Sequence, residues 1–327
     1  TGLGFQPDWL WFKSRSSAFS HRLYDTSRGI ASNGGKRLNS NTDNAENDQT
    51  SGQDISAVGT DGFTLGASSN LYTNDTNSGG LQVAWNWRAN GGTTASNTTG
   101  GTNSVTQVDP SKAFSIVTYT GFSGASGSST VGHGMGVAPA MIIHKSRTRS
   151  SGWWTQFPNL LTNAGYFLDL AGTGAQANLN SYGTMNVPTT SVFTINGVDG
   201  VGGESANYVA YCFANIEGYC KVGSYKGNGN ADGTFVYTGF KPNYVLIRST
   251  SSSRHWGIHD TKRSTTNPSL LQIDADDSYA EFSSASRSRD FLSNGFKLRT
   301  SDADVNAAET YVYLAMSHNP FKYSLAR

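Results

Sequence analysis

The chain has 327 residues, a formal net charge of +1, and many glycine and aromatic residues, with 38 Gly, 15 Tyr, 16 Phe and 7 Trp. This charge balance offers no basic surface for phosphates, which argues against nucleic acid as a partner. Apolar runs such as residues 9–12 and 208–213 fall far short of the roughly 18 residues of a membrane helix, so no membrane insertion is expected. The composition favours an all-β chain with little helix.

One pattern occurs three times along the chain. In each copy a Gly-hydrophobic-any-Pro sequence precedes an apolar strand that ends in a basic residue: Gly4–Pro7 with Trp9–Lys13, Gly136–Pro139 with Met141–Lys145, and Gly239–Pro242 with Tyr244–Arg248. A short strand and a closing strand follow: Gly62–Leu65 and Val83–Trp87, Val192–Ile195 and Val209–Phe213, Gly295–Leu298 and Val312–Met316. The second and third copies match at a constant offset of 103 residues, so we infer a triplicated unit.

The first copy, predicted as a module over residues 1–110 that includes a linker, lacks the opening strand of the others. The second and third copies begin with a matching strand, Phe114–Gly121 and Cys220–Gly227, for which the first copy has no room. We therefore expect the native chain to extend upstream of Thr1. Residues 90–104 are rich in Gly, Thr and Asn without periodicity, which predicts a flexible linker or a long surface loop.

The second and third modules are predicted over residues 111–218 and 219–327. Only residues 216–219 separate them, so these two are expected to dock rigidly, with any hinge lying before them. Turn signals between short strands predict three tandem antiparallel β-sandwiches of jelly-roll type. The two cysteines, Cys212 and Cys220, fit either two buried thiols or a cross-strand disulfide.

Several core strands are apolar at consecutive positions, as in Trp9–Phe12 and Tyr311–Met316. A strand with one face in water would alternate apolar and polar residues. The second apolar face is therefore expected to pack against a neighbouring module or another chain, and we infer a homo-oligomer, a trimer that also buries sheet edges. The alternative is that each strand lies sandwiched inside its own module.

Two aromatic pairs, Trp153-Trp154 and His255-Trp256, occupy corresponding places in the second and third copies. Exposed rings there would stack on a sugar or a partner, whereas buried rings would pack in the core. The sequence Asp25-Thr-Ser-Arg28 recurs as Asp260-Thr-Lys-Arg263, either as a turn in which Asp caps amides and pairs with Arg, or as a binding surface. The candidate glycan- or partner-binding residues are Trp153, Trp154, His255, Trp256, Asp260 and Arg263.

No catalytic constellation stands out. The five glutamates form no site motif, the acidic clusters 274–277 and 302–304 lie in polar loops, and the six histidines have no Ser and Asp partners at a triad spacing. The acidic clusters lack the spaced oxygen ligands and closing Glu of a calcium loop. The sequence therefore predicts a protein that is not an enzyme, with no cofactor and no metal site.

Five runs of sequence suggest a family: GFQPDWLWFKSR, HGMGVAPAMIIHKSR, GNGNADGTFVYTGFKPNYVLIRS, FLSNGFKLRTS and YVYLAMSHNPF. They resemble a repeat family at the C-terminal end of long structural proteins of marine and cyanobacterial tailed phages. The resemblance covers nearly the whole chain. It implies a tail-fibre, appendage or head-decoration component located in the virion among other virion proteins, and it assigns no catalytic residue.

Three functions follow as hypotheses. The first is a virion protein that contacts host-surface glycans through its loops. The second is a purely architectural decoration or filament-forming subunit without receptor binding. The third, a polysaccharide depolymerase, is disfavoured because no acid pair is evident.

Overall fold

A computed structural model describes residues 2–31, 34–48, 54–66, 72–74, 80–124 and 126–318. The described chain is almost entirely β, with antiparallel pairing throughout its named strands. Its helices are two short 3-10 turns, η1 (Asn180–Tyr182) and η2 (Ala285–Arg287). Within these ranges no helix has the length and apolar character needed to cross a membrane. The predicted all-β antiparallel class is confirmed.

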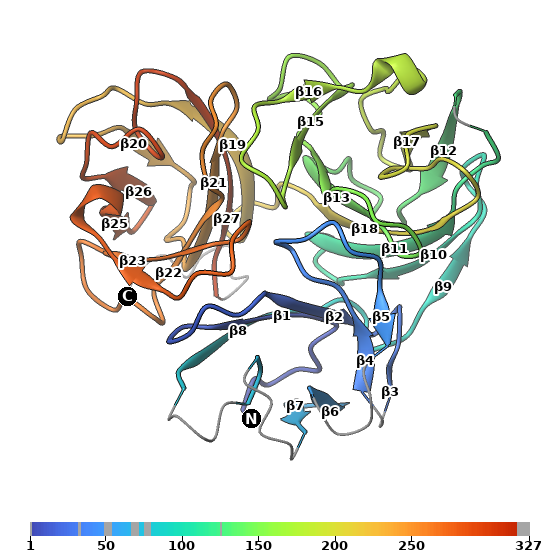
Figure 1. Cartoon of the computed structure of the whole chain (residues 1–327), viewed down its shortest axis with the longest axis horizontal. Helices are drawn as coiled ribbons and strands as arrows, with labels where there is room; N and C mark the ends of the chain where they lie inside the picture. Colours follow the sequence, from blue (N-terminus) through green and yellow to red (C-terminus); the bar gives the residue numbers. More distant parts are fainter. Residues whose placement is uncertain are drawn as a thin grey trace.

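Three central sheets form the middle of the molecule (Figure 1). The first has the order β2-β1-β8, comprising Arg22–Asp25, Trp9–Ser14 and Gln82–Trp87. The second has the order β16-β15-β14-β13-β18-β11-β10-β9, comprising Ala177–Asn178, Tyr166–Asp169, Trp154–Gln156, Met141–Ser146, Asn207–Phe213, Phe114–Thr120, Ser104–Val108 and Ala95–Asn97. The third has the order β19-β27-β21-β22-β23-β24, comprising Cys220–Lys226, Thr310–Met316, Tyr244–Ser249, Gly257–Asp260, Leu271–Asp274 and Phe282–Ser283.

Four small sheets lie outside the central ones. They are β3-β4-β5 (Ile30–Ala31, Gly34–Arg37, Asn47–Asp48), β6-β7 (Ile55–Gly59, Gly62–Leu65), β12-β17 (Ser128–Gly132, Val192–Asn196) and β20-β26-β25 (Phe235–Tyr237, Gly295–Leu298, Arg289–Leu292). The strands that the repeated pattern predicts are all present, with bounds that differ by no more than two residues from the expected ones. The repeated pattern therefore located the elements correctly.

The three central sheets share one strand order. In each, the strand after the Gly-Pro sequence pairs on one side with the closing strand and on the other with a following strand: β1 with β8 and β2, β13 with β18 and β14, β21 with β27 and β22. The registers also correspond, since Trp11 pairs with Trp85, Ile143 with Tyr211 and Leu246 with Leu314.

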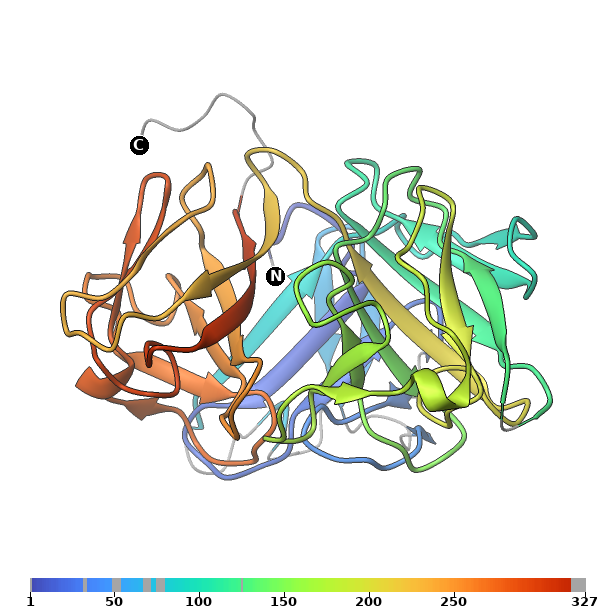
Figure 2. The same cartoon turned by 90° about the horizontal axis from the view of Figure 1, so that it is seen from above.

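One hydrophobic core joins all three sheets. It contains Trp9 and Trp11 from the first sheet, Met141 from the second, and Leu246 and residues of β27 from the third. The sheets face one another around this core, with the first (blue), second (green) and third (orange to red) arranged about the middle of Figure 1. The view from above shows the second and third sheets flanking the first (Figure 2).

The consecutive apolar residues of the core strands are explained by two cores on either side. In β1, Trp9 and Trp11 belong to the shared core, whereas Leu10 and Phe12 belong to a separate outer core. Strands β13 and β21 divide their residues in the same way. One apolar face of each strand therefore packs against the neighbouring sheets and the other against its own outer sheet, all within the same chain. The trimer stays a prediction, but these strands no longer argue for it.

Residues 90–104 were predicted to be a flexible linker or a surface loop, and most of them are exposed and lie outside strands. They contain β9 and lead into β10, which extends the second sheet by pairing with β11 from Ser104↔Tyr119 to Val108↔Ser115. The open edge of β11 provides main-chain partners that periodicity within the segment does not reveal.

The two cysteines are free and buried, which confirms the thiol interpretation. Residues 319–327, the end of the third predicted module and of the last family motif, lie outside the described residues.

Candidate functional site

The predicted aromatic residues lie at the contacts between central sheets. Trp153 and Trp256 are 0% and 1% exposed. Trp153 Nε1 donates to the Asn39 carbonyl at 2.9 Å, beside the first sheet, and Trp256 Nε1 donates to the Asp169 carbonyl of the second sheet at 2.8 Å. Core packing is therefore the correct interpretation of both residues, because neither indole face is open to a sugar ring.

Histidine 21 takes the equivalent place in the first sheet. Its Nδ1 accepts a hydrogen bond from Trp11 Nε1 at 2.7 Å, so its Nε2 carries the proton that is donated to the Asp274 carbonyl at 3.0 Å. Burial, with a smaller effect from the charge of Lys13, lowers the pKa of His21 to about 3. Each sheet thus donates one ring N–H to a carbonyl beside the next sheet, and the three contacts close a cycle. In the first sheet a neutral histidine stands where the others have tryptophan. The larger Trp11 there stands where the others have Ile143 and Leu246.

Trp154 and His255 are more accessible than their neighbours. Trp154 is half-buried, and its Nε1 lies 3.4 Å from Ser151 Oγ. The imidazole of His255 is 38% exposed and pairs with Asp276 at 2.8 Å. The hydrogen bond to Asp276 raises the pKa of His255 to about 9, so the side chain is a cation at neutral pH. Their role in ligand binding stays a prediction.

The two Asp-Arg sequences form turns that also reach the next sheet. Asp260 Oδ1 accepts from the Arg263 amide at 2.8 Å, and Asp260 Oδ2 pairs with Arg263 Nε at 2.6 Å. The same carboxylate accepts from Trp85 Nε1 of the first sheet at 2.9 Å. Asp25 repeats the arrangement, with Tyr211 of the second sheet as its outside donor at 2.6 Å. Each turn therefore fastens one sheet to its neighbour.

A glutamate completes each of these two contacts. Glu46 binds Arg28 and Arg147 at 3.0 Å each, and Glu281 binds Arg263 and Arg15 at 2.7 Å each. Burial would raise the pKa of Glu46, but hydrogen bonds from Arg147 and the charge of Arg28 hold it below its usual range.

Sequence reasoning missed both glutamates. The available signal was spacing, because Glu46 follows Asp25 by 21 residues and Glu281 follows Asp260 by the same 21.

The basic residue that ends each repeated strand is buried and binds carbonyls. Lys145 Nζ donates to the carbonyls of Asp43 at 2.9 Å and Ser151 at 2.6 Å, and Arg248 donates to those of Gly174 and Arg254. Lys13 binds the carbonyls of Ser14 and Ser17. Burial lowers the pKa of Lys13 and of Lys145 to about 8. For Lys145 and Arg248, the contacts bring in loops from a neighbouring part of the chain.

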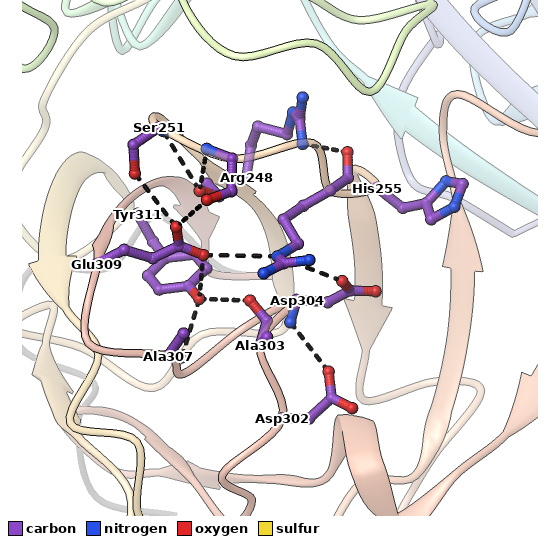
Figure 3. A network of polar contacts seen from close by, with 12 residues as sticks. Arg248, Ser251, His255, Asp302, Ala303, Asp304, Ala307, Glu309 and Tyr311 are labelled. Atoms are coloured by element: carbon purple, nitrogen blue, oxygen red, sulfur yellow. Dashed lines mark hydrogen bonds and ion pairs between the residues drawn. The ribbon is translucent and has the colours of Figure 1, made fainter.

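A polar network closes the loops at one end of the third sheet (Figure 3). The phenol of Tyr311 donates to the Ala303 carbonyl at 2.5 Å and accepts from the Ala307 amide at 2.9 Å. Arg254 lies 3.5 Å from Glu309 and 3.7 Å from Asp304. Burial would raise the pKa of Glu309, but hydrogen bonds from Ser252, Tyr311 and Ser251 and the charge of Arg254 lower it. The network is suited to holding loops together.

A surface groove with a volume of about 400 Å³ lies on the second sheet. Its lining comes from β9, β10 and β11, from the start of β18 and from Arg147. The lining residues are Ser96, Asn97, Thr98, Asn103, Ser104, Val105, Thr118, Tyr119, Thr120, Arg147 and Asn207. Sequence reasoning missed this groove, because it exists only where the β9–β10 segment pairs with β11.

The chemistry of the groove is that of neutral hydrogen bonding. Hydroxyls and amides dominate it, the single cation Arg147 is paired with Glu46, and none of the lining residues has a carboxylate. Such a lining can donate to and accept from the hydroxyl groups of a neutral ligand. Among the residues that the structure describes, no three His, Cys, Asp or Glu side chains are grouped as a metal site.

Comparison with known proteins gives a family without a stated activity. No curated protein and no solved structure matches the chain. The chain belongs to the family described as "Domain of unknown function (DUF7483)", whose model matches residues 1–320.

Proposed function

We propose that this chain is a non-enzymatic structural and attachment protein of a tailed-phage virion, a tail fibre, appendage or surface decoration, that binds host-surface glycans. Its three equivalent units are proposed to be β-sandwich modules with the boundaries given above. The sequence resemblance motivates the virion location. The groove on the second sheet carries the binding proposal, because its hydroxyl and amide lining matches the hydrogen-bonding pattern of a neutral sugar.

The packing of the molecule is consistent with a scaffold role. The buried ion pairs at Glu46 and Glu281 and the ring-to-carbonyl contacts all connect one sheet to the next. Side chains that could act as acids or bases are therefore engaged in structural pairs at these contacts. A rigid block with a polar surface groove suits display of a binding surface on a particle.

A glycan array with the whole chain tests the binding proposal. We expect saturable binding to at least one neutral glycan, and we expect Asn97→Ala and Asn207→Ala each to weaken it about five- to tenfold, since one neutral hydrogen bond contributes about 1 kcal/mol. The exposed Asn230→Ala, outside the groove, is the matched control. Absence of binding to every glycan, or equal loss in the control variant, would contradict the proposal.

The purely architectural alternative and the enzyme hypothesis have separate readouts. Reconstruction of assembled particles would show the chain in a surface or filament position whether or not it binds glycans. Release of reducing sugar from a polysaccharide would instead support a depolymerase. Sedimentation of the purified chain would test the predicted trimer directly.

A further inference from the structure

The second and third sheets differ at one edge. Strands β11 and β19 are equivalent, because Phe114 pairs with Phe213 of β18 and Cys220 pairs with Met316 of β27. On its other side β11 pairs with β10, whereas within the described ranges β19 has β27 as its one strand partner. The third sheet thus ends at a strand whose equivalent in the second sheet is covered. Part of this edge is occupied, since the Val222 amide donates to Asn215 Oδ1 and the Lys226 carbonyl accepts from Thr234 Oγ1, so the open part is centred on Ser224.

In the second unit, β10 and the residues before it also contact the outer sheet. The Thr102 amide donates to the Thr130 carbonyl at 2.8 Å, and Ser104 Oγ donates to the Gly132 carbonyl at 2.7 Å. This segment therefore fills the space between β11 and β12. The equivalent of β12 is β20, because Val131 pairs with Phe193 and Val236 pairs with Phe296.

In the third unit the corresponding surface is open and aromatic. Phe235 and Tyr237, the equivalents of Thr130 and Gly132, are 43% and 65% exposed, while Val236 between them is buried. Ser224 on the edge of β19 is also exposed. Exposed aromatic groups that flank an edge strand are typical of interaction surfaces.

The charges around this edge restrict what can bind there. Lys221 and Lys226 lie on β19, whereas their equivalents in the second sheet are the neutral Ser115 and Thr120. Lys297 on the outer sheet is already paired with Asp232 at 2.6 Å, so the two lysines of β19 set the charge of this edge. A second copy of β19 would place like charges together, which disfavours self-pairing. Opposite charge favours a strand with acidic residues beside it, and Asp109 directly follows β10 in the covered unit.

We propose that the edge of β19, together with Phe235 and Tyr237, is a docking site for an extended polypeptide strand of another protein chain. The strand carries small hydroxyl or β-branched side chains and a flanking carboxylate, as β10 and Asp109 do. It binds by strand addition, so main-chain hydrogen bonds to β19 supply affinity and the aromatic rings supply contact area. This site lies on a different sheet from the glycan groove, and its test is independent of glycan binding.

The probe is a synthetic peptide with the sequence of residues 103–109, added to the whole chain. We expect saturable binding and at least tenfold slower exchange of the Ser224 and Lys226 amides, which point away from β27. A peptide with proline in place of the residue equivalent to Val105, whose amide faces β11 in the covered unit, loses a ladder donor and is expected not to bind. Equal binding of the proline peptide, or unchanged exchange at β19, would overturn the proposal.

Surface variants test the aromatic and charged contributions without altering the core. Tyr237→Ser is expected to weaken peptide binding at least threefold and Lys226→Glu to weaken it further at low salt. Tyr279→Ser is the matched control, because Tyr279 is 68% exposed and lies after β23. If Tyr237→Ser abolished binding of an oligosaccharide and left peptide binding unchanged, the surface would be a sugar site and the proposal would be wrong.

Discussion

The contacts between the central sheets are of two kinds. The contact of the first sheet with the second, and that of the third with the first, each contain an Asp-Arg turn, a bridging glutamate and an aromatic donor. The contact of the second sheet with the third has Phe157 in the place of the aspartate, stacked on Trp256 with ring centroids 6.3 Å apart. Leu160 stands three residues later, where the other turns have arginine.

The main-chain geometry of the three contacts is nevertheless the same. The amides of Glu46, Gln176 and Glu281 donate to the carbonyls of Arg147, Thr250 and Arg15 at 2.7, 3.0 and 2.9 Å. A polar side-chain set and an apolar one therefore support one arrangement. The shared aromatic core and these amide hydrogen bonds therefore define the geometry of all three contacts. The space between the sheets is then filled either by ion pairs or by apolar side chains.

The largest expected effect comes from the core that all contacts share. Trp256→Ala removes a buried indole at the apolar contact and should lower the free energy of unfolding by about 3–5 kcal/mol. Trp153→Ala at a polar contact should cost a similar amount if the core, and not the ion pairs, dominates. Denaturant unfolding of both variants checks this. A loss below 1 kcal/mol for either would contradict the shared-core account.

The ion pairs should give the next largest effect. Glu46→Gln leaves the fully buried Arg28 with Asp25 as its remaining carboxylate and removes the charge that Arg147 meets. We expect a loss of about 2 kcal/mol, because hydrogen bonds between charged groups contribute about that much. Asp48→Asn, whose carboxylate is 79% exposed, is the matched control and should change stability by less than about 0.5 kcal/mol. Equal effects in chemical denaturation would show that burial of Glu46 has no energetic importance.

A pH dependence at the contact of the first and third sheets gives the smallest effect just below neutral pH, and it grows as the pH falls further. His21 has a folded-state pKa of about 3, below the ordinary histidine value of 6.5, so the unfolded chain binds the proton first. Stability is full above pH 6.5 and falls as pH decreases from 6.5 towards 3, by about 1.4 kcal/mol per pH unit for this residue. His21→Gln keeps a donor and an acceptor without titrating.

Unfolding free energies measured between pH 7 and 4 should therefore fall less steeply for His21→Gln than for the native chain. His144, which burial also brings to a pKa of about 3, contributes its own slope in both proteins and so cancels in the comparison. Parallel curves would indicate that His21 is not buried as a neutral ring.

The sequence by itself determined the strands of the repeated pattern, their threefold recurrence and the all-β class. Residue patterns such as Gly-hydrophobic-any-Pro followed by an apolar strand recur at fixed spacing, and local backbone preferences act within a few residues. The equivalence of Trp153 with Trp256 was visible for the same reason. The choice between exposed and buried indoles was not, because both are compatible with one strand pattern.

Only the tertiary structure decided which surfaces meet. Glu46 and Arg147 are about a hundred residues apart in sequence, and β9 and β10 form because β10 pairs with the edge of β11 and β9 pairs with β10. Consecutive apolar residues showed that both faces of β1 are covered but not by what, since a neighbouring sheet and another chain bury the same area. Packing between distant segments depends on how three sheets close around one core, and no local pattern encodes that closure.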